Sequence, residues 1–221
     1  QGRQLLVVRA VMSNGSDCVA IQSSCYDYTM LGIDEVGRGP LAGPVTICLF
    51  YAPKSLDLLS LFEGRKLKDS KKLSEKKREE IYRSLQELKQ QNKVNWVVLS
   101  SSAKDIDKLG ISKCIYKSIQ KGLNNFPDVK KKDIKLDGAL PKEFGEIIIK
   151  GDEKVPVIAL ASIVAKVTRD RYMKSLDKKV PGYGFAQHAG YGSAAHRSAV
   201  RSLGPSKYHR ITYLSRTLQK S

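Results

Sequence analysis

Residues 31–44 read Leu-Gly-Ile-Asp-Glu-Val-Gly-Arg-Gly-Pro-Leu-Ala-Gly-Pro, and this stretch decides how the chain is built. Its first six residues, 31–36, predict a buried strand that ends in a glycine-rich loop. Two adjacent acids, Asp34 and Glu35, stand near the end of that strand. Adjacent strand residues point to opposite faces, so both acids serve one site only if the chain bends. Gly37 and Gly39 permit such a bend.

Strands and helices alternate on either side of this stretch. Apolar runs predict further strands at 45–51, 96–99, 134–136 and 147–149. Apolar residues at helical spacing predict helices at 74–90, 112–123, 156–178 and 195–203, the first with Ser74 as its N-cap. The alternation predicts an α/β fold in which helices flank a central mixed β-sheet.

The length of 221 residues fits one domain, and 41% hydrophobic residues are enough to bury a core. We expect a catalytic domain at 30–221, whose last part, about 180–221, is a C-terminal helical extension. Residues 1–29 differ in composition and form an N-terminal extension of unknown role. Three interpretations of it stay open: a flexible extension, a remnant of an organellar targeting segment, or sequence upstream of a start at Met30. It lacks the pattern of a secretory signal.

The charge is strongly positive and unevenly spread. The formal net charge is +17, and residues 164–221 carry 12 basic and 2 acidic side chains. Such a balance favours a polyanionic partner, with nucleic acid ahead of an anionic membrane surface. A basic face kept for solubility explains the composition as well. No apolar run approaches the ~18 residues of a membrane span. The 4 cysteines lack C-x-x-C spacing, which is typical of a reduced intracellular chain without a disulfide framework.

Four acids stand out in this basic chain. Asp34 and Glu35 end the first strand, Asp137 follows another strand, and Asp170 lies in the long helix. If they converge, they form an all-oxygen site suited to Mg²⁺ or Mn²⁺. Two such ions can activate a water and stabilise the leaving oxygen of a phosphodiester. The alternative is that each is a cap, turn or surface acid, because spacing alone does not show convergence.

A series of motifs, in order along the chain, resembles the ribonuclease HII family, the type 2 ribonucleases H. The resemblance covers about residues 30–214. Its motifs are Gly-Ile-Asp-Glu-Val-Gly-Arg-Gly-Pro-Leu-Ala-Gly-Pro (32–44), Asp-Ser-Lys-Lys-Leu-Ser (69–74), Asp-Gly (137–138), Lys-Gly-Asp (150–152), Ala-Ser-Ile-Val-Ala-Lys-Val-Thr-Arg-Asp-Arg (161–171), Pro-Gly-Tyr-Gly-Phe (181–185), His-Ala-Gly-Tyr-Gly-Ser (188–193) and His-Arg (209–210).

The resemblance implies a ribonuclease H-like fold and an activity. The expected enzyme hydrolyses the RNA strand of RNA–DNA hybrids and cleaves on the 5′ side of single ribonucleotides in duplex DNA, leaving 3′-hydroxyl and 5′-phosphate ends. It implies two divalent ions, Mn²⁺ or Mg²⁺. The expected partners are hybrid and ribonucleotide-containing duplexes, with no membrane partner. We further expect a monomer in the cytoplasm.

The resemblance also assigns roles to individual residues. It implies that Asp34, Glu35, Asp137 and Asp170 are the catalytic metal ligands, with Asp152 as a competing acid. The loop Gly37-Arg38-Gly39 resembles the segment that contacts the ribose at the cleavage junction. Tyr191 resembles the tyrosine that packs on the neighbouring deoxyribose, and Lys71 and Lys72 resemble phosphate contacts. The alternative is that Tyr191 is an ordinary loop tyrosine and that Lys71 and Lys72 belong to a solvated basic loop.

Two other functions would use parts of the same sequence. A non-catalytic nucleic-acid-binding module would use the same basic surface, but four acids facing phosphates would weaken its binding unless metal is present. A two-metal DNA nuclease of the same fold gives no reason for a ribose-contacting loop. The spacing of His188, His196 and His209 does not favour zinc, and metal-free histidine catalysis would not need the acids.

Overall fold

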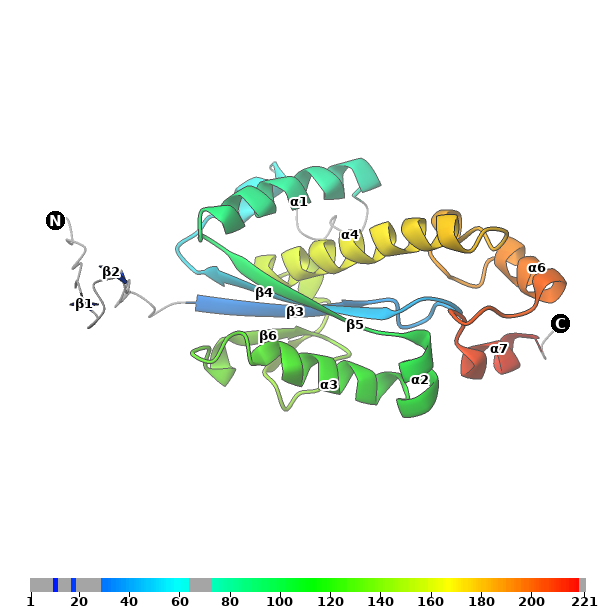
Figure 1. The fold of residues 1–221 in the computed structure, drawn as a ribbon. Helices are drawn as coiled ribbons and strands as arrows, with labels where there is room; N and C mark the ends of the chain where they lie inside the picture. The colour runs from blue at the N-terminus through cyan, green and yellow to red at the C-terminus, as the bar shows by residue number, and fades with distance from the viewer. Residues whose placement is uncertain (1–9, 12–16, 19–28, 64–72, 219–221) are drawn as a thin grey trace.

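The structure is a computed structural model that describes residues 10–11, 17–18, 29–63 and 73–218 (Figure 1). Its centre is a five-stranded sheet in the order β5-β4-β3-β6-β7. The strands are β3 (Thr29–Val36), β4 (Val45–Pro53), β5 (Asn95–Ser101), β6 (Ile134–Asp137) and β7 (Glu146–Ile148). β1 (Ala10–Val11) and β2 (Asp17–Cys18) form a separate antiparallel pair.

The sheet is mixed, as the alternation predicts. β4 pairs antiparallel with both β3 and β5, whereas β6 runs parallel to β3 and to β7. Ile33 on β3 is opposite Leu136 on β6. One residue further along these parallel strands come Asp34 and Asp137, so the register itself places two of the four acids on neighbouring strands.

Helices cover both faces of the sheet (Figure 1). α1 (Glu75–Gln90) and α4 (Pro156–Lys179) pack over one face, and α2 (Ala103–Leu109) and α3 (Ile111–Leu123) lie along the other. Alternate residues of the strands face the two layers: Phe50 lies in the core beneath α1 and α4, and Leu49 in the core beneath α3. This three-layer packing confirms the predicted α/β class.

The C-terminal part is helical. It contains α5 (Phe185–His188), α6 (Ala194–Leu203) and α7 (Ile211–Leu218), which lie together beyond one end of the sheet (Figure 1). A small third core of its own holds this region against α4, with Met173, Leu176 and Phe185 among its buried side chains. Three single 3₁₀ turns, η1 (Leu59–Phe62), η3 (Lys131–Asp133) and η4 (Gly151–Glu153), complete the described elements.

Local sequence explains most of the elements. Ser74 caps α1, and its side chain accepts a hydrogen bond from the N–H of Lys77 at 3.2 Å, as predicted. α2 was not predicted, because its seven residues bury only Ala103 and Ile106, too few for a periodic pattern. A capping box between Ser102 and Asp105 starts it.

The long helix α4 is more deeply buried than its predicted apolar seam requires. Val157, Leu160, Val164 and Val167 of that seam are buried, but so are Ile158, Ala159, Ala161, Ile163 and Ala165. The first half of α4 is therefore enclosed between the sheet and α1 rather than lying on the surface. No helix in the described ranges is long and apolar enough to cross a membrane.

Candidate active site

Two strands and one helix bring the first acids together. Asp34 on β3 is only 5% exposed and points toward α4, where the Ser162 hydroxyl is its hydrogen-bond partner. The N–H of Glu35 donates to Asp34 Oδ1 at 2.7 Å. Burial, followed by the negative charges of Glu35 and Asp137, raises the pKa of Asp34 to about 8. The site thus crowds carboxyl groups where little solvent reaches them, which disfavours the ionised form of Asp34.

Glu35 shares this environment. Burial raises the pKa of Glu35, and Asp137 adds to the rise, whereas the Arg38 guanidinium opposes it. Arg38 Nη1 donates to Glu35 Oε1 at 3.2 Å and to the carbonyl of Ala139 at 3.3 Å. The second carboxylate oxygen, Oε2, is buried with no hydrogen-bond partner. A buried carboxylate oxygen without a donor is a position where a cation can bind.

Asp137 is held by the turn that follows β7. The N–H of Gly151 donates to Asp137 Oδ1 at 2.7 Å. A Cβ on Gly151 would lie 2.6 Å from Ile158 Cδ1 and 3.4 Å from that same carboxylate oxygen, so a side chain there would require Ile158 to shift. The competing acid of the sequence analysis, Asp152, is the next residue in η4 and is 2% exposed.

Asp170 is held by basic side chains of α4 and α1. Its Oδ1 accepts from Lys166 Nζ at 2.8 Å, and Arg78 Nη2 lies 3.9 Å from its Oδ2. Over residues 29–63 and 73–218, no three acidic, histidine or cysteine side chains already lie close enough together to hold a metal ion. Asp137 lies close enough to Asp34 and Glu35 to raise the pKa of both, whereas Asp170 is engaged in ion pairs with Lys166 and Arg78.

A pocket of about 160 Å³ lies between the end of β3 and the two helices above it. Glu35 and Val36 line it from β3, Arg78 from α1, and Ser162 and Lys166 from α4. One acid and two cations thus face the same space. Because Lys166 also donates to Asp170, it links that acid to the pocket that Glu35 lines.

The glycine-rich loop folds back toward Tyr191. Gly37 has φ +91°, and a Cβ there would lie 2.4 Å from Arg169 Nε, so only glycine fits without strain. Gly39 is exposed, and a Cβ on it would lie 4.0 Å from the Tyr191 ring. The side chain of Tyr191 is 44% exposed. The structure therefore brings the loop and Tyr191 together on the surface. Lys71 and Lys72 lie outside the described residues.

Sequence reasoning missed three kinds of site residue. Ser162, the hydroxyl partner of Asp34, is one turn of α4 before Lys166, and that spacing was the available signal. Arg169 and Arg210 are fully buried, which a basic composition disguises. The three histidines form a packed cluster, and His196 and His209 are buried within it. Their wide separation along the chain concealed this.

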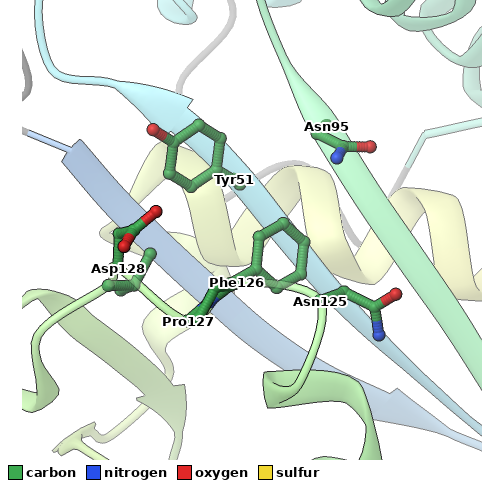
Figure 2. A pocket seen from close by; sticks show the side chains of 7 residues that line it. Tyr51, Asn95, Asn125, Phe126, Pro127 and Asp128 are labelled. Atoms are coloured by element: carbon green, nitrogen blue, oxygen red, sulfur yellow. The ribbon is translucent and has the colours of Figure 1, made fainter. Parts of the chain in front are cut away.

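A second pocket, of about 240 Å³, lies elsewhere (Figure 2). Tyr51 and Phe126 stack across it with ring centroids 5.7 Å apart, and Asp128 is its acidic residue. Tyr51 pairs with Leu31 near the beginning of β3, whereas the acids lie near its end. This pocket is therefore not part of the acidic site.

Comparison with known proteins identifies the family. The family model described as ribonuclease HII matches residues 31–217. The ribonuclease HII of Lachnoclostridium phytofermentans is 42% identical over 191 residues, which are 85% of this chain and 71% of the relative.

Solved structures agree with the fold. A ribonuclease HII from Archaeoglobus fulgidus, solved with PCNA, superposes with a TM-score of 0.68 at 24% identity and covers 84% of this chain and 94% of its own. A Bst ribonuclease HIII solved with Mn²⁺ has a TM-score of 0.59 at 18% identity, covering 87% and 71%. The chain therefore belongs to the ribonuclease HII family, metal-dependent endoribonucleases that act on RNA–DNA hybrids.

Proposed function

We propose that this ribonuclease HII cleaves on the 5′ side of a ribonucleotide, in hybrids and at single ribonucleotides in duplex DNA, with two divalent ions held by the four acids. The products are 3′-hydroxyl and 5′-phosphate ends. The observation that carries the proposal is the buried carboxyl group of Asp34 with the half-buried Glu35 and Asp137 beside it, at the ends of β3 and β6. Their mutual repulsion makes the site costly unless a cation balances it.

The donor set suits hard divalent ions. Asp34, Glu35 and Asp137 offer only oxygen atoms, and the buried Oε2 of Glu35 has no hydrogen-bond donor. Mg²⁺ and Mn²⁺ prefer such ligands. When bound, the ions supply an activated water and stabilise the leaving oxygen. The ribonuclease HIII neighbour, whose structure contains Mn²⁺, supports the same choice of ion.

Asp170 completes the proposed ligand set. It lies one helical turn beyond Lys166, which lines the same pocket as Glu35. Without a cation, the carboxylate of Asp170 is balanced by Lys166 and Arg78. In the proposed site these two basic side chains turn instead to the phosphate, because a phosphodiester brings the negative charge that they then neutralise. Lys71 and Lys72 stay proposed phosphate contacts.

The selection of a ribonucleotide is assigned to the loop and Tyr191. A 2′-hydroxyl both donates and accepts hydrogen bonds, and glycine lets the backbone approach a sugar closely. Gly39 is exposed beside the Tyr191 ring. The ring thus offers an apolar face for the deoxyribose next to the ribonucleotide. The substrate is held by the basic surface and selected by this small contact.

The proposal is tested by mapping the products from a DNA duplex that contains one ribonucleotide, with Mg²⁺ and with Mn²⁺. We expect a single cut on its 5′ side. Tyr191→Ala should lower cleavage of this duplex more than cleavage of a long hybrid, while Tyr191→Phe, which keeps the ring, should lower it less. An equal loss on both substrates would remove Tyr191 from junction recognition. Metal-independent binding without any cleavage would support a binding module instead.

A further inference from the structure

We propose that His209 and Arg210 form the positioning element that sets the Gly37–Gly39 loop and Tyr191 relative to each other. The inference rests on the proposed ribose selection and deepens it. Both residues come from the turn before α7, far along the chain from the two segments that they hold. Both side chains are buried, at 2% and 0% exposure. Neither contributes a ligand or a reacting group.

Arg210 binds the backbone carbonyl groups of the loop. Its Nη2 donates to Gly37 O at 2.7 Å and to Gly43 O at 2.9 Å, its Nη1 to Arg38 O at 2.9 Å, and its Nε to Gly43 O at 3.0 Å. Burial lowers the pKa of Arg210 to about 10, so the guanidinium keeps its charge at neutral pH. The buried, charged guanidinium of Arg210 binds the loop backbone, since three carbonyl groups of that loop accept its hydrogen bonds.

The orientation of these carbonyls orients the N–H groups that follow. In a trans peptide the C=O and the next N–H point in opposite directions. With the carbonyls of Gly37 and Arg38 turned inward to Arg210, the N–H groups of Arg38 and Gly39 point away from it. Gly39 is exposed. Arg210 therefore presents two loop donors to the side where the ribose is proposed to lie.

His209 reaches Tyr191 through one intermediate. His196 Nδ1 lies 2.9 Å from Tyr191 O, which can only accept, so Nδ1 carries the proton. Burial lowers the pKa of both His196 and His209, the latter to about 4, so both are neutral at pH 7. His196 Nε2 is then the acceptor for His209 Nε2 at 3.0 Å. Ser206 N–H donates to the remaining nitrogen, His209 Nδ1, at 2.9 Å.

The backbone joins the same parts. The N–H of Leu41 donates to Gly190 O and its carbonyl accepts from Arg210 N–H, both at 2.8 Å. Gly43 N–H donates to Tyr208 O at 2.9 Å. Residues 41–43 thus lie between the Tyr191 segment and the turn that carries His209 and Arg210. A displacement of this turn moves both sides of the ribose contact.

The first test is Arg210→Lys, with the exposed Arg83→Lys on α1 as matched control. A lysine ammonium cannot reproduce the planar fork that serves three carbonyls. We expect kcat/KM on the one-ribonucleotide duplex to fall at least about 30-fold, with the inhibition constant of the same duplex made only of DNA changed less than about threefold. The control should change neither. A purely structural role would change both constants by one factor, and that result, or an unchanged kcat/KM, would overturn the inference.

A second pair of variants covers the case in which Arg210→Lys does not fold. His209→Gln keeps a donor at the Nε2 position, whereas His209→Leu removes it. We expect the leucine variant to lose about tenfold in kcat/KM and the glutamine variant to retain most of it. Equal losses would contradict the role of the histidine link. If the wild-type enzyme itself does not cleave the one-ribonucleotide duplex, the proposed function has failed rather than the positioning.

Discussion

Asp34 lowers the stability of the folded chain because its carboxyl group is suited to bind a cation rather than to pack in a protein interior. Its carboxylate is buried beside two other acids, an arrangement that disfavours the ionised form. Its hydrogen bonds from Ser162 and from the Glu35 N–H offset only part of the cost. Such a group persists because function requires it, and its removal should therefore stabilise the metal-free chain.

We predict that Asp34→Asn lowers cleavage by more than about tenfold while stabilising the chain in EDTA. Asp34 titrates at about 8 when folded and at 3.8 when unfolded. A raised folded pKa means that its stabilising contribution is full below about pH 4 and is lost as pH rises toward 8. The variant's advantage in unfolding free energy should therefore grow over pH 4–8, by at most about 1.4 kcal/mol per pH unit.

Urea unfolding at several pH values checks this prediction. The exposed Asp128→Asn serves as control and should show no comparable trend. An Asp34→Asn variant that is less stable than the wild type at pH 8 in EDTA would contradict the burial argument. A variant that keeps cleavage within tenfold of the wild type would remove Asp34 from the metal site.

Gly37 is a second residue at which the neighbouring atoms restrict what side chain can be accommodated. At φ +91° an added Cβ meets Arg169 Nε at 2.4 Å and Pro44 O at 2.8 Å. We predict that Gly37→Ala destabilises the chain by ~2 kcal/mol or more. Gly110→Ala, at φ +80° with nothing within 4 Å of the new Cβ, isolates the backbone strain and should cost ~1 kcal/mol. Equal shifts of the two urea midpoints would show that contact with Arg169 is unimportant.

Elements far apart in the chain depend on one another through side chains that bind backbone. α7 begins with N–H groups that its own preceding residues do not satisfy. Asp107 of α2 accepts from Ile211 N at 2.8 Å, from Thr212 N at 3.1 Å and from Thr212 Oγ1 at 2.6 Å. A carboxylate at a helix N-terminus also interacts favourably with the helix dipole. α2 thus anchors the start of α7 across the molecule.

We predict that Asp107→Ala destabilises the chain by ~1 kcal/mol and does so locally. Amide hydrogen exchange should rise in α7 (Ile211–Leu218) and stay unchanged in α1, which Ser74 caps independently. Asp107→Asn, which keeps one acceptor oxygen, should show a smaller rise. Unchanged exchange in α7 would mean that packing alone holds this helix.

Charge acts at the scale of the whole molecule. A net charge of +17 surrounds a small acidic site. The basic surface attracts a polyanion, and the acids bind cations. Positive side chains therefore serve substrate binding, and negative side chains serve metal binding. This division explains how a strongly basic chain can contain partly buried acids near one another.

We predict that affinity for an uncleavable DNA duplex falls steeply with salt. If several of the 12 basic residues in 164–221 contact phosphates, the slope of log affinity against log salt should be about −3 or steeper. Fluorescence anisotropy between about 0.05 and 0.3 M KCl measures it. A slope shallower than about −1 would mean that the charge serves solubility rather than binding.

The sequence by itself determined the α/β class, the main strands and helices, the cap of α1 and the family. Period-2 and period-3.6 patterns are local, and the ordered motifs are specific. It also singled out Asp34, Glu35, Asp137 and Asp170 as candidate metal ligands through the resemblance of their motifs to the family, but it left open whether they converge. The short helix α2 was not predicted, because its two buried residues are too few to form a periodic apolar pattern.

Only the tertiary structure decided the rest. It placed Asp170 in ion pairs with Lys166 and Arg78. It also turned Arg169, His196, His209 and Arg210, which look like surface residues in a basic chain, into buried contacts. Their partners are backbone carbonyls and other side chains more than ten residues away or across the fold. Burial and long-range hydrogen bonding have no period in sequence, so they become visible only when the chain is folded.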